Sequence, residues 1–246
     1  MTFILGFGHS HIVAIAEGFS LWRCTAAQAE GVASQFHYLH APEFTPNVAA
    51  AETGLNGAIL EKFAQPDLCA TFLSVGGNEH NILSVLQNFG RIDFILGEEP
   101  DLPLEAGAEI LTEAALCEAL RGRARQPLAA IAAFGRVEAR PMIFFEAPPP
   151  LPTHHIVEHP GDLLGPAGHR APISPERLRY KMWRLSCALY REACEAAGIA
   201  YLPVPPSLID AQGMLAAQGL GPDATHANER FGLVMVKQAM GRLGFL

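Results

Sequence analysis

The feature that most constrains the fold is a nearly continuous apolar run, Leu68-Cys-Ala-Thr-Phe-Leu-Ser-Val75, which ends at two glycines. A run without polar alternation is typical of a central strand in a parallel sheet, because such a strand is buried on both faces. The polar turn Gly76-Gly77-Asn78-Glu79-His80-Asn81 follows, and helix-forming sequence extends from Ile82 to Phe89. The segment therefore predicts strand, turn and helix, the repeating unit of an α/β fold.

Other segments of the chain repeat this pattern. We predict further strands at the N-terminus between Thr2 and Gly8, from Gln35 to Leu39, from Pro141 to Glu146 and from Ile199 to Val204. Five strands that are each followed by helix or loop predict a doubly wound parallel sheet. No linker divides the sequence, so we expect a single α/β domain over residues 1–246.

Composition and charge argue against several classes of protein. The formal net charge is −8, and Arg121-Gly-Arg-Ala-Arg125 is an isolated basic cluster, so nucleic acid is not an expected partner. No uncharged apolar run approaches the ~18 residues of a membrane span, and no secretory signal follows Met1. The five cysteines lack C-x-x-C spacing and predict no disulfide. We expect a soluble, cytoplasmic protein without a membrane partner, and the sequence leaves its oligomeric state open.

Ser10 follows the first predicted strand and precedes a predicted helix, which places it at the ligand-binding edge of a parallel sheet. It has three interpretations. The serine could cap the helix, as serine often does. The two glycines of Gly6-Phe7-Gly8 could begin a dinucleotide-binding G-x-G-x-x-G motif, but His11 replaces the third glycine. Ser10 could also be a nucleophile, which requires a base from elsewhere in the chain.

Asp223 and His226 are candidates for that base. They stand three residues apart before the last predicted helix, so the carboxylate can reach one imidazole nitrogen. Such a contact fixes the tautomer and leaves the other nitrogen free to accept a proton. Both residue types are also common at helix starts and turns. The Asp223–His226 pair is therefore significant only together with the other candidate site residues, Ser10 among them.

The sequence resembles the SGNH, or GDSL-type, hydrolase family across nearly the whole chain. Gly8-His9-Ser10-His11 resembles the first motif block, Gly54 matches the glycine of the second, Gly76-Gly77-Asn78-Glu79 resembles the third, and Asp223-Ala224-Thr225-His226 matches the last. The resemblance implies a three-layer α/β/α sandwich around a five-stranded, flavodoxin-like parallel sheet. Two positions depart from the family pattern: His9 replaces an aspartate before the serine, and Glu79 replaces an aspartate after the asparagine.

The resemblance also implies a Ser-His-Asp triad. Ser10 would attack an ester carbonyl, His226 would act as base and then as acid, and Asp223 would orient the imidazole. The oxyanion hole would consist of the Ser10 N–H, the Gly54 N–H and the Asn78 side-chain amide. The expected substrate is a small-molecule ester, such as a small acyl group on a carbohydrate or another polar metabolite, and no cofactor is expected.

Two other functions remain open at this stage. An acyltransferase would use the same triad with an alcohol in place of water, and a non-catalytic ligand-binding module would share the fold without turnover. A long segment from Ala147 to Pro172, rich in proline and histidine, predicts a loop that covers the site. It lacks recognisable metal-ligand spacing, so no metal site is expected. We expect these polar side chains to contact substrate: His9, His11, Glu79, His80, His154 and His155.

Overall fold

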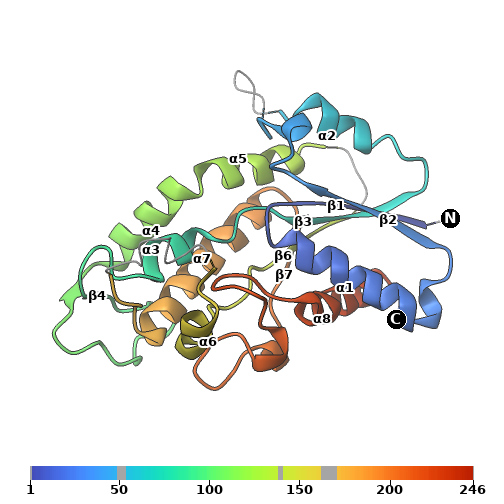
Figure 1. The fold of residues 1–246 in the computed structure, drawn as a ribbon. Coiled ribbons are helices and arrows are strands. Elements are labelled where there is room, and N and C mark those ends of the chain that lie inside the picture. The colour runs from blue at the N-terminus through green and yellow to red at the C-terminus, as the bar shows by residue number, and fades with distance from the viewer. Residues whose placement is uncertain (1, 49–53, 138–140, 162–170, 246) are drawn as a thin grey trace.

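The computed structural model describes residues 2–48, 54–137, 141–161 and 171–245, which surround a five-stranded parallel sheet (Figure 1). The strand order is β2-β1-β3-β6-β7, and every neighbouring pair is parallel. The strands are β1 (Thr2–Gly8), β2 (Val32–Tyr38), β3 (Leu68–Ser74), β6 (Met142–Phe145) and β7 (Ala200–Leu202). Each predicted strand overlaps one of these, so the predicted sheet is confirmed.

The sheet separates two apolar cores and forms the middle of three layers. In β3, Ala70 and Phe72 enter one core and Leu73 enters the other, as the alternation of side chains along a strand requires. The first core is closed by α1 (Ile12–Thr25) and α8 (Glu229–Arg242). The second is closed mainly by α4 (Glu113–Arg123), α5 (Arg125–Phe134) and α7 (Glu176–Ala196). This arrangement is a three-layer α/β/α sandwich.

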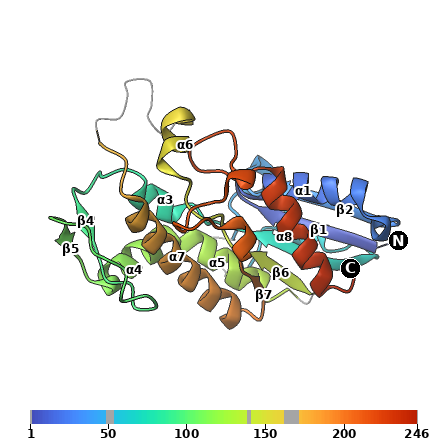
Figure 2. The ribbon, with the colours of Figure 1, turned by 90° about the horizontal axis from the view of Figure 1, so that it is seen from below.

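Two glycines allow α1 and α8 to touch through their backbones. Figures 1 and 2 show the helices side by side. A Cβ atom on Gly18 would lie 2.1 Å from the carbonyl carbon of Gly232, and one on Gly232 would lie 1.7 Å from the oxygen of Ala14. Larger residues would therefore push the helices apart. Ser10 lies two residues before α1 and His226 lies three residues before α8, so this close crossing brings the two segments to the same edge of the sheet.

The segment from Arg91 to Gly107 differs from its prediction as an exposed excursion before a helix starting at Ala108. A second, two-stranded parallel sheet forms there from β4 (Ile92–Asp93) and β5 (Glu109–Ile110). Asp93 is buried, and its Oδ1 atom lies 2.9 Å from Nζ of Lys181 in α7. This buried ion pair depends on residues distant in sequence, and a pattern of neighbouring residues cannot reveal it.

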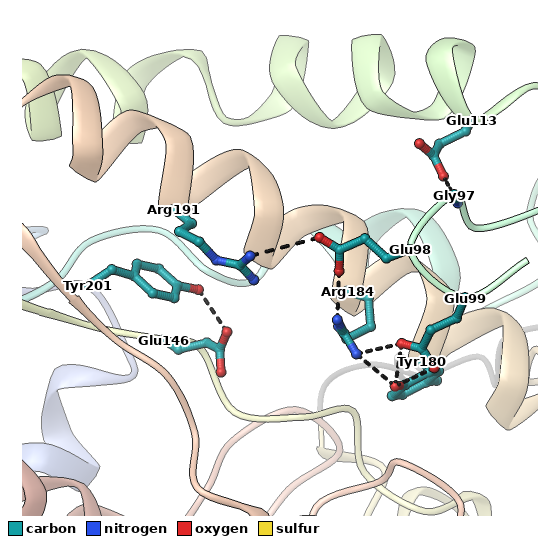
Figure 3. Close-up of polar contacts among 9 residues, drawn as sticks. All are labelled: Gly97, Glu98, Glu99, Glu113, Glu146, Tyr180, Arg184, Arg191 and Tyr201. Carbon is teal, nitrogen blue, oxygen red and sulfur yellow. Dashed lines mark hydrogen bonds and ion pairs between the residues drawn. The ribbon is translucent and has the colours of Figure 1, made fainter.

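The same segment is also attached to α7 at the surface (Figure 3). Arg184 donates hydrogen bonds to Glu98 at 2.6 Å and to Glu99 at 2.5 Å, and Tyr180 donates to Glu99 at 2.8 Å. On the opposite side of the segment, the Gly97 N–H donates to Glu113 at 2.5 Å. These contacts fix the segment against α7 and the start of α4.

The proline-rich segment is also more regular than its prediction as a loop. It contains α6 (Thr153–Glu158), which begins after Pro152, at a position where the missing proline N–H is not needed. The fully buried Arg179 donates to the Leu151 oxygen and to Thr153 Oγ1 at 2.7 Å, and the Thr153 N–H donates to Glu176 at 2.7 Å. Tertiary contacts from α7 therefore hold this short helix. Residues 162–170, which include His169, lie outside the described part of the chain.

The remaining helices are short. Among the described residues, the remaining α-helices are α2 (Gly57–Lys62) and α3 (Glu79–Ser84), and single 3-10 turns form elsewhere, such as Pro42–Phe44 and Pro206–Leu208. Helix α3 starts three residues earlier than predicted, directly after the turn that ends at Asn78. Within the described ranges, no helix combines the length and the apolar composition that crossing a bilayer requires.

Candidate active site

Ser10 lies between the end of β1 and the start of α1. The N-cap residue of α1 is His11, which makes no side-chain capping bond. Among the described residues, the Ser10 hydroxyl has no hydrogen-bond partner, and its backbone N–H has none either. The interpretation of Ser10 as a helix cap is therefore wrong. A serine hydroxyl and N–H without partners at the carboxyl edge of the sheet are free to interact with a ligand.

Asp223 and His226 form the contact that their spacing predicts. The distance from Asp223 Oδ2 to His226 Nδ1 is 2.7 Å, and Asp223 Oδ1 accepts hydrogen bonds from the N–H groups of Thr225 at 2.8 Å and His226 at 3.0 Å. The hydrogen bond from His226 is the main reason why the pKa of Asp223 lies well below its usual value. Asp223 is therefore ionised at neutral pH and orients the imidazole. His226 Nε2 is buried and has no hydrogen-bond partner among the described residues.

Ser10, Asp223 and His226 line one cavity of about 650 Å³, which we call the His226 cavity. Its walls come from the start of α1 and from the segment that precedes α8, the two regions that the Gly18–Gly232 contact brings together. No hydrogen bond joins Ser10 Oγ to His226. The structure thus brings the predicted triad to one cavity.

Asn78 lies on the other side of Ser10. Together they line a second cavity of about 660 Å³, the Asn78 cavity. The Asn78 side chain does not cap α3; instead its Oδ1 accepts a hydrogen bond from Asn81 Nδ2 at 2.8 Å. Because the oxygen is engaged, the amide NH₂ group is the end available to a ligand. Asn81 was not among the predicted site residues, although its i, i+3 spacing from Asn78 indicates a side-chain contact on a helix.

His9 stabilises the turn after β3. Its Nδ1 accepts a hydrogen bond from the Gly76 N–H at 2.8 Å, so the neutral ring carries its proton on Nε2. Nε2 lies 3.4 Å from the side-chain amide of Asn47. When the Asn47 amide nitrogen donates hydrogen bonds to the backbone oxygens of Leu39 and Phe44, the Asn47 oxygen faces His9 and can accept a hydrogen bond from Nε2. Burial, and secondly His40, lowers the pKa of His9 to about 4. His9 lines the Asn78 cavity as a neutral side chain.

Glu79 supports the same turn from below. The buried Oε2 atom accepts hydrogen bonds from the Gly77 N–H at 2.9 Å and from the Tyr190 hydroxyl at 2.8 Å. Burial, followed by the charge of Glu79, raises the pKa of Tyr190 well above its usual value. Glu79 therefore positions the backbone next to Asn78. Glu79 also lines the Asn78 cavity, so its predicted contact with substrate stays a prediction, although the carboxylate is already hydrogen bonded within the protein.

His11 and His80 form a buried cluster with His226. The ring centroids of His11 and His226 are 5.4 Å apart. Burial lowers the pKa of both His11 and His80 to about 3, and for His11 the neighbouring His226 and His80 add to this effect. Both imidazoles are therefore neutral at neutral pH. His11 lines the His226 cavity, whereas the side chain of His80 is 0% exposed. The prediction that His80 contacts substrate is corrected by this burial.

The described histidines of the proline-rich segment, His154, His155 and His159, also lie outside the two cavities. His155 is buried, its Nε2 is 3.0 Å from the Gly221 oxygen, and its ring stacks on His159. His154 is exposed on α6. The structure therefore corrects the prediction of substrate contact for both residues. His155 instead supports the segment that carries Asp223, and Gly161 also lies against that aspartate.

Gly54 is described, while residues 49–53 of the same motif block are not. The residue after it, Leu55, pairs with Val48, which lines the Asn78 cavity. Gly54 itself is not among the described residues that line that cavity, and a Cβ atom on it would meet no atom within 4 Å. Its role as an oxyanion donor stays a prediction. No group of three or more His, Cys, Asp or Glu residues in the described ranges has the geometry of a metal site.

Comparisons with known proteins show a likeness of fold. No family model and no curated protein match the sequence. A gut microbial diltiazem-metabolizing enzyme is 10% identical with a TM-score of 0.56, over 99% of this chain and 47% of that enzyme. A Streptococcus pneumonia protein named for platelet activating factor is 14% identical with a TM-score of 0.50, over 98% and 83%. A GDSL-like lipase from Bacteroides thetaiotaomicron is 10% identical with a TM-score of 0.40, over 99% and 87%.

These observations identify the protein at the level of fold. The parallel five-stranded sheet between two helical layers, with polar side chains gathered at its carboxyl edge, defines a three-layer α/β/α protein. Within that class, the chain shares its fold with the diltiazem-metabolizing enzyme and with the Streptococcus pneumonia protein described above.

Proposed function

We propose that this protein is a serine ester hydrolase with Ser10 as nucleophile. The observation that carries the proposal is the 2.7 Å contact between Asp223 and His226 on the same cavity as Ser10. The ionised Asp223 fixes the proton of His226 on Nδ1, so Nε2 is the basic nitrogen. A triad needs a nucleophile and a base that are both free to react. Among the described residues, neither the Ser10 hydroxyl nor His226 Nε2 has a hydrogen-bond partner.

In the first half of the reaction, His226 Nε2 takes the Ser10 proton while Ser10 Oγ attacks the ester carbonyl carbon. The carbonyl oxygen becomes an oxyanion, which the Ser10 N–H and the Asn78 amide stabilise as its charge develops. The bond to the leaving oxygen then breaks, and His226 delivers its proton to the departing alcohol. The products of this half are the alcohol and an acyl-Ser10 ester.

In the second half, water takes the place of the alcohol. His226 removes a proton from the water, and the resulting oxygen nucleophile attacks the acyl carbon. Collapse of the second tetrahedral intermediate breaks the bond to Ser10 Oγ, which regains the proton from His226. The acid is released and the enzyme is restored.

The Asn78 cavity supports a polar substrate. Side chains with hydrogen-bonding groups line it, and they include His40, Thr45, Asn47 and Gln126. A small acyl group on a carbohydrate or on another polar metabolite would be hydrogen bonded in such surroundings. An all-apolar acyl tunnel would instead require a lining of aliphatic and aromatic residues.

Covalent labelling tests the proposal. A fluorophosphonate should modify Ser10, as peptide mass spectrometry would show, and Ser10→Ala should lose both labelling and the hydrolysis of aryl acetates. Ser20→Ala is the matched control, since the Ser20 hydroxyl bonds only to the Ala16 oxygen in α1. A folded wild-type protein that takes no label and hydrolyses no ester would favour a non-catalytic binding module. Ester transfer to added alcohols without hydrolysis would favour an acyltransferase.

A further inference from the structure

The two cavities that meet at Ser10 differ in charge. The His226 cavity has the carboxylates of Glu17 and Glu229 on its walls in addition to Asp223, and no lysine or arginine among its described lining residues. The Asn78 cavity has Arg123 on its wall. Its only described carboxylate is Glu79, which is buried and hydrogen bonded to Gly77 and Tyr190. One side of Ser10 is therefore anionic, and the other presents a cation.

Arg123 belongs to the basic cluster at the junction of α4 and α5, and the arginines of this cluster differ in their contacts. Arg121 forms ion pairs with Glu118 at 3.6 Å and with Glu192 at 3.8 Å. Arg123 has no ion-pair partner within the described ranges, and it lines the Asn78 cavity beside Gln126. Arg125 is exposed, as Arg121 and Arg123 are, but it lines neither cavity at Ser10. In a chain of net charge −8, a guanidinium on a cavity wall that has no ion-pair partner among the described residues can pair with an anionic group of a ligand.

The chemistry of the proposed hydrolase assigns the two halves of the ester to the two cavities. His226 must protonate the leaving oxygen, so the alcohol half extends into the His226 cavity. The acyl half then extends into the Asn78 cavity, toward Arg123. The carboxylates of Glu17 and Glu229 would repel an anion in the opposite orientation.

We propose, on the basis of the proposed hydrolase function, that the acyl half of the substrate ends in an anionic group that pairs with Arg123. A half-ester of a dicarboxylic acid is the simplest compound of this class. The alcohol half is neutral or cationic. Arg123 is thus a specificity-determining residue: it attracts the anionic end of the acyl group and takes no part in bond cleavage.

Kinetics on matched esters test this assignment. The substrates are the mono-4-nitrophenyl esters of adipic and pimelic acid, each compared with its methyl ester, which has the same chain but no charge. Wild type should prefer the free acids in kcat/KM. Because an exposed ion pair contributes roughly 0.2–1 kcal/mol, Arg123→Gln should reduce the preference roughly 1.4- to 5-fold, and Arg123→Glu should invert it. High salt should weaken the wild-type preference through screening.

The controls separate the possible explanations. Arg121→Gln and Arg125→Gln make the same change in net charge and should keep the preference. If these variants and Arg123→Gln all behave like wild type while hydrolysis still depends on Ser10, the inference is wrong and the hydrolase function stands. If Glu17→Gln raises kcat/KM for the free acids and Arg123→Gln has no effect, the acyl half lies in the His226 cavity, which overturns the assignment.

A binding measurement makes the test independent of turnover. Titration calorimetry of Ser10→Ala with the adipate half-ester should give a weaker Kd when Arg123→Gln is added, and an unchanged Kd when Arg121→Gln is added. Equal affinities would refute the role of Arg123 even in a protein without esterase activity. Conversely, a folded wild type that binds the half-ester through Arg123 and hydrolyses no ester would leave the anion site standing and refute the hydrolase.

Discussion

The hydrogen bond between Asn81 and Asn78 makes a specific prediction about the oxyanion hole. Asn81 Nδ2 donates a hydrogen bond to Asn78 Oδ1. The Asn78 amide nitrogen therefore points away from Asn81 and can donate to an oxyanion. Asn81 is itself buried and lines neither cavity at Ser10. Asn81→Asp replaces the donor by an acceptor, and the Asn78 amide should then turn over to donate to the new carboxylate. Its carbonyl oxygen would face the oxyanion.

The magnitudes follow from what each variant removes. Asn78→Ala removes one oxyanion donor and should lower kcat roughly 10²–10³-fold, or ~2.7–4 kcal/mol, with little change in KM. Asn81→Ala removes only the restraint, and a neutral hydrogen bond of ~0.5–1.5 kcal/mol gives a loss of roughly 2- to 10-fold. Asn81→Asp should approach the loss seen in Asn78→Ala, since a reversed amide is no better than a missing one.

The assay is steady-state hydrolysis of an activated ester, with melting temperatures measured on the same preparations. Asn88→Asp is the control, because Asn88 is exposed and its substitution makes the same change in charge. Combining Asn78→Ala with Asn81→Asp should cost little more kcat than Asn78→Ala alone, because Asn81 acts through Asn78. Multiplicative losses in the double variant, or equal losses from Asn81→Asp and Asn81→Ala, would refute the reasoning. An Asn78→Ala protein that keeps its kcat but melts at a lower temperature would show that Asn78 is a turn residue and not an oxyanion donor.

Further predictions concern the triad and the buried histidines. Ser10→Ala and His226→Ala should each remove most esterase activity in a folded protein, and the double variant should be hardly slower than either, since triad members act as a unit. Asp223→Asn should lower kcat by up to roughly 10⁴-fold through loss of the required tautomer, with binding largely retained. His80 has a pKa of about 3 in the folded chain against 6.5 for an ordinary histidine, so the unfolded state binds the extra proton and stability must fall as pH decreases below 6.5. Between pH 7 and 5 this loss is about 2 kcal/mol for His80, and urea titrations at both pH values should show a smaller loss in His80→Gln than in wild type. An equal pH dependence in the two proteins would show that His80 gains its proton without unfolding.

The sequence predicts those parts of the fold that depend on neighbouring residues. The run from Leu68 to Val75 indicates a buried strand because burial on both faces removes polar alternation, and β3 forms there. The Asp223–His226 contact was predictable because three residues of spacing suffice for it. Ser10 and Asn78 could be placed at one edge of the sheet because parallel strands direct their carboxyl ends to the same side.

Features that depend on distant residues could not be predicted in this way. The contact of Gly18 with Gly232 aligns α1 with α8, but each glycine by itself indicates only a weak point in a helix. Helix α6 exists because the buried Arg179 of α7 satisfies the backbone before it. Both His11 and His80 follow strand ends in the sequence and were predicted to contact substrate, and only the packed structure distinguishes His80 in the core from His11 on a cavity wall.

His9 stands where the hydrolase family that the sequence resembles usually has an aspartate, and this difference bears on the anion inferred above. An aspartate next to Ser10 would add a negative charge at the Asn78 cavity, which an anionic acyl group would have to approach. His9 accepts a hydrogen bond from the Gly76 N–H, as a carboxylate could, but its pKa of about 4 keeps the imidazole uncharged at neutral pH. The turn is therefore supported without adding a negative charge. Glu79, the second departure, directs its charge into hydrogen bonds with Gly77 and Tyr190. Among the described residues that line this cavity, Arg123 is therefore the charged side chain without an ion-pair partner. An anionic acyl group could pair with it.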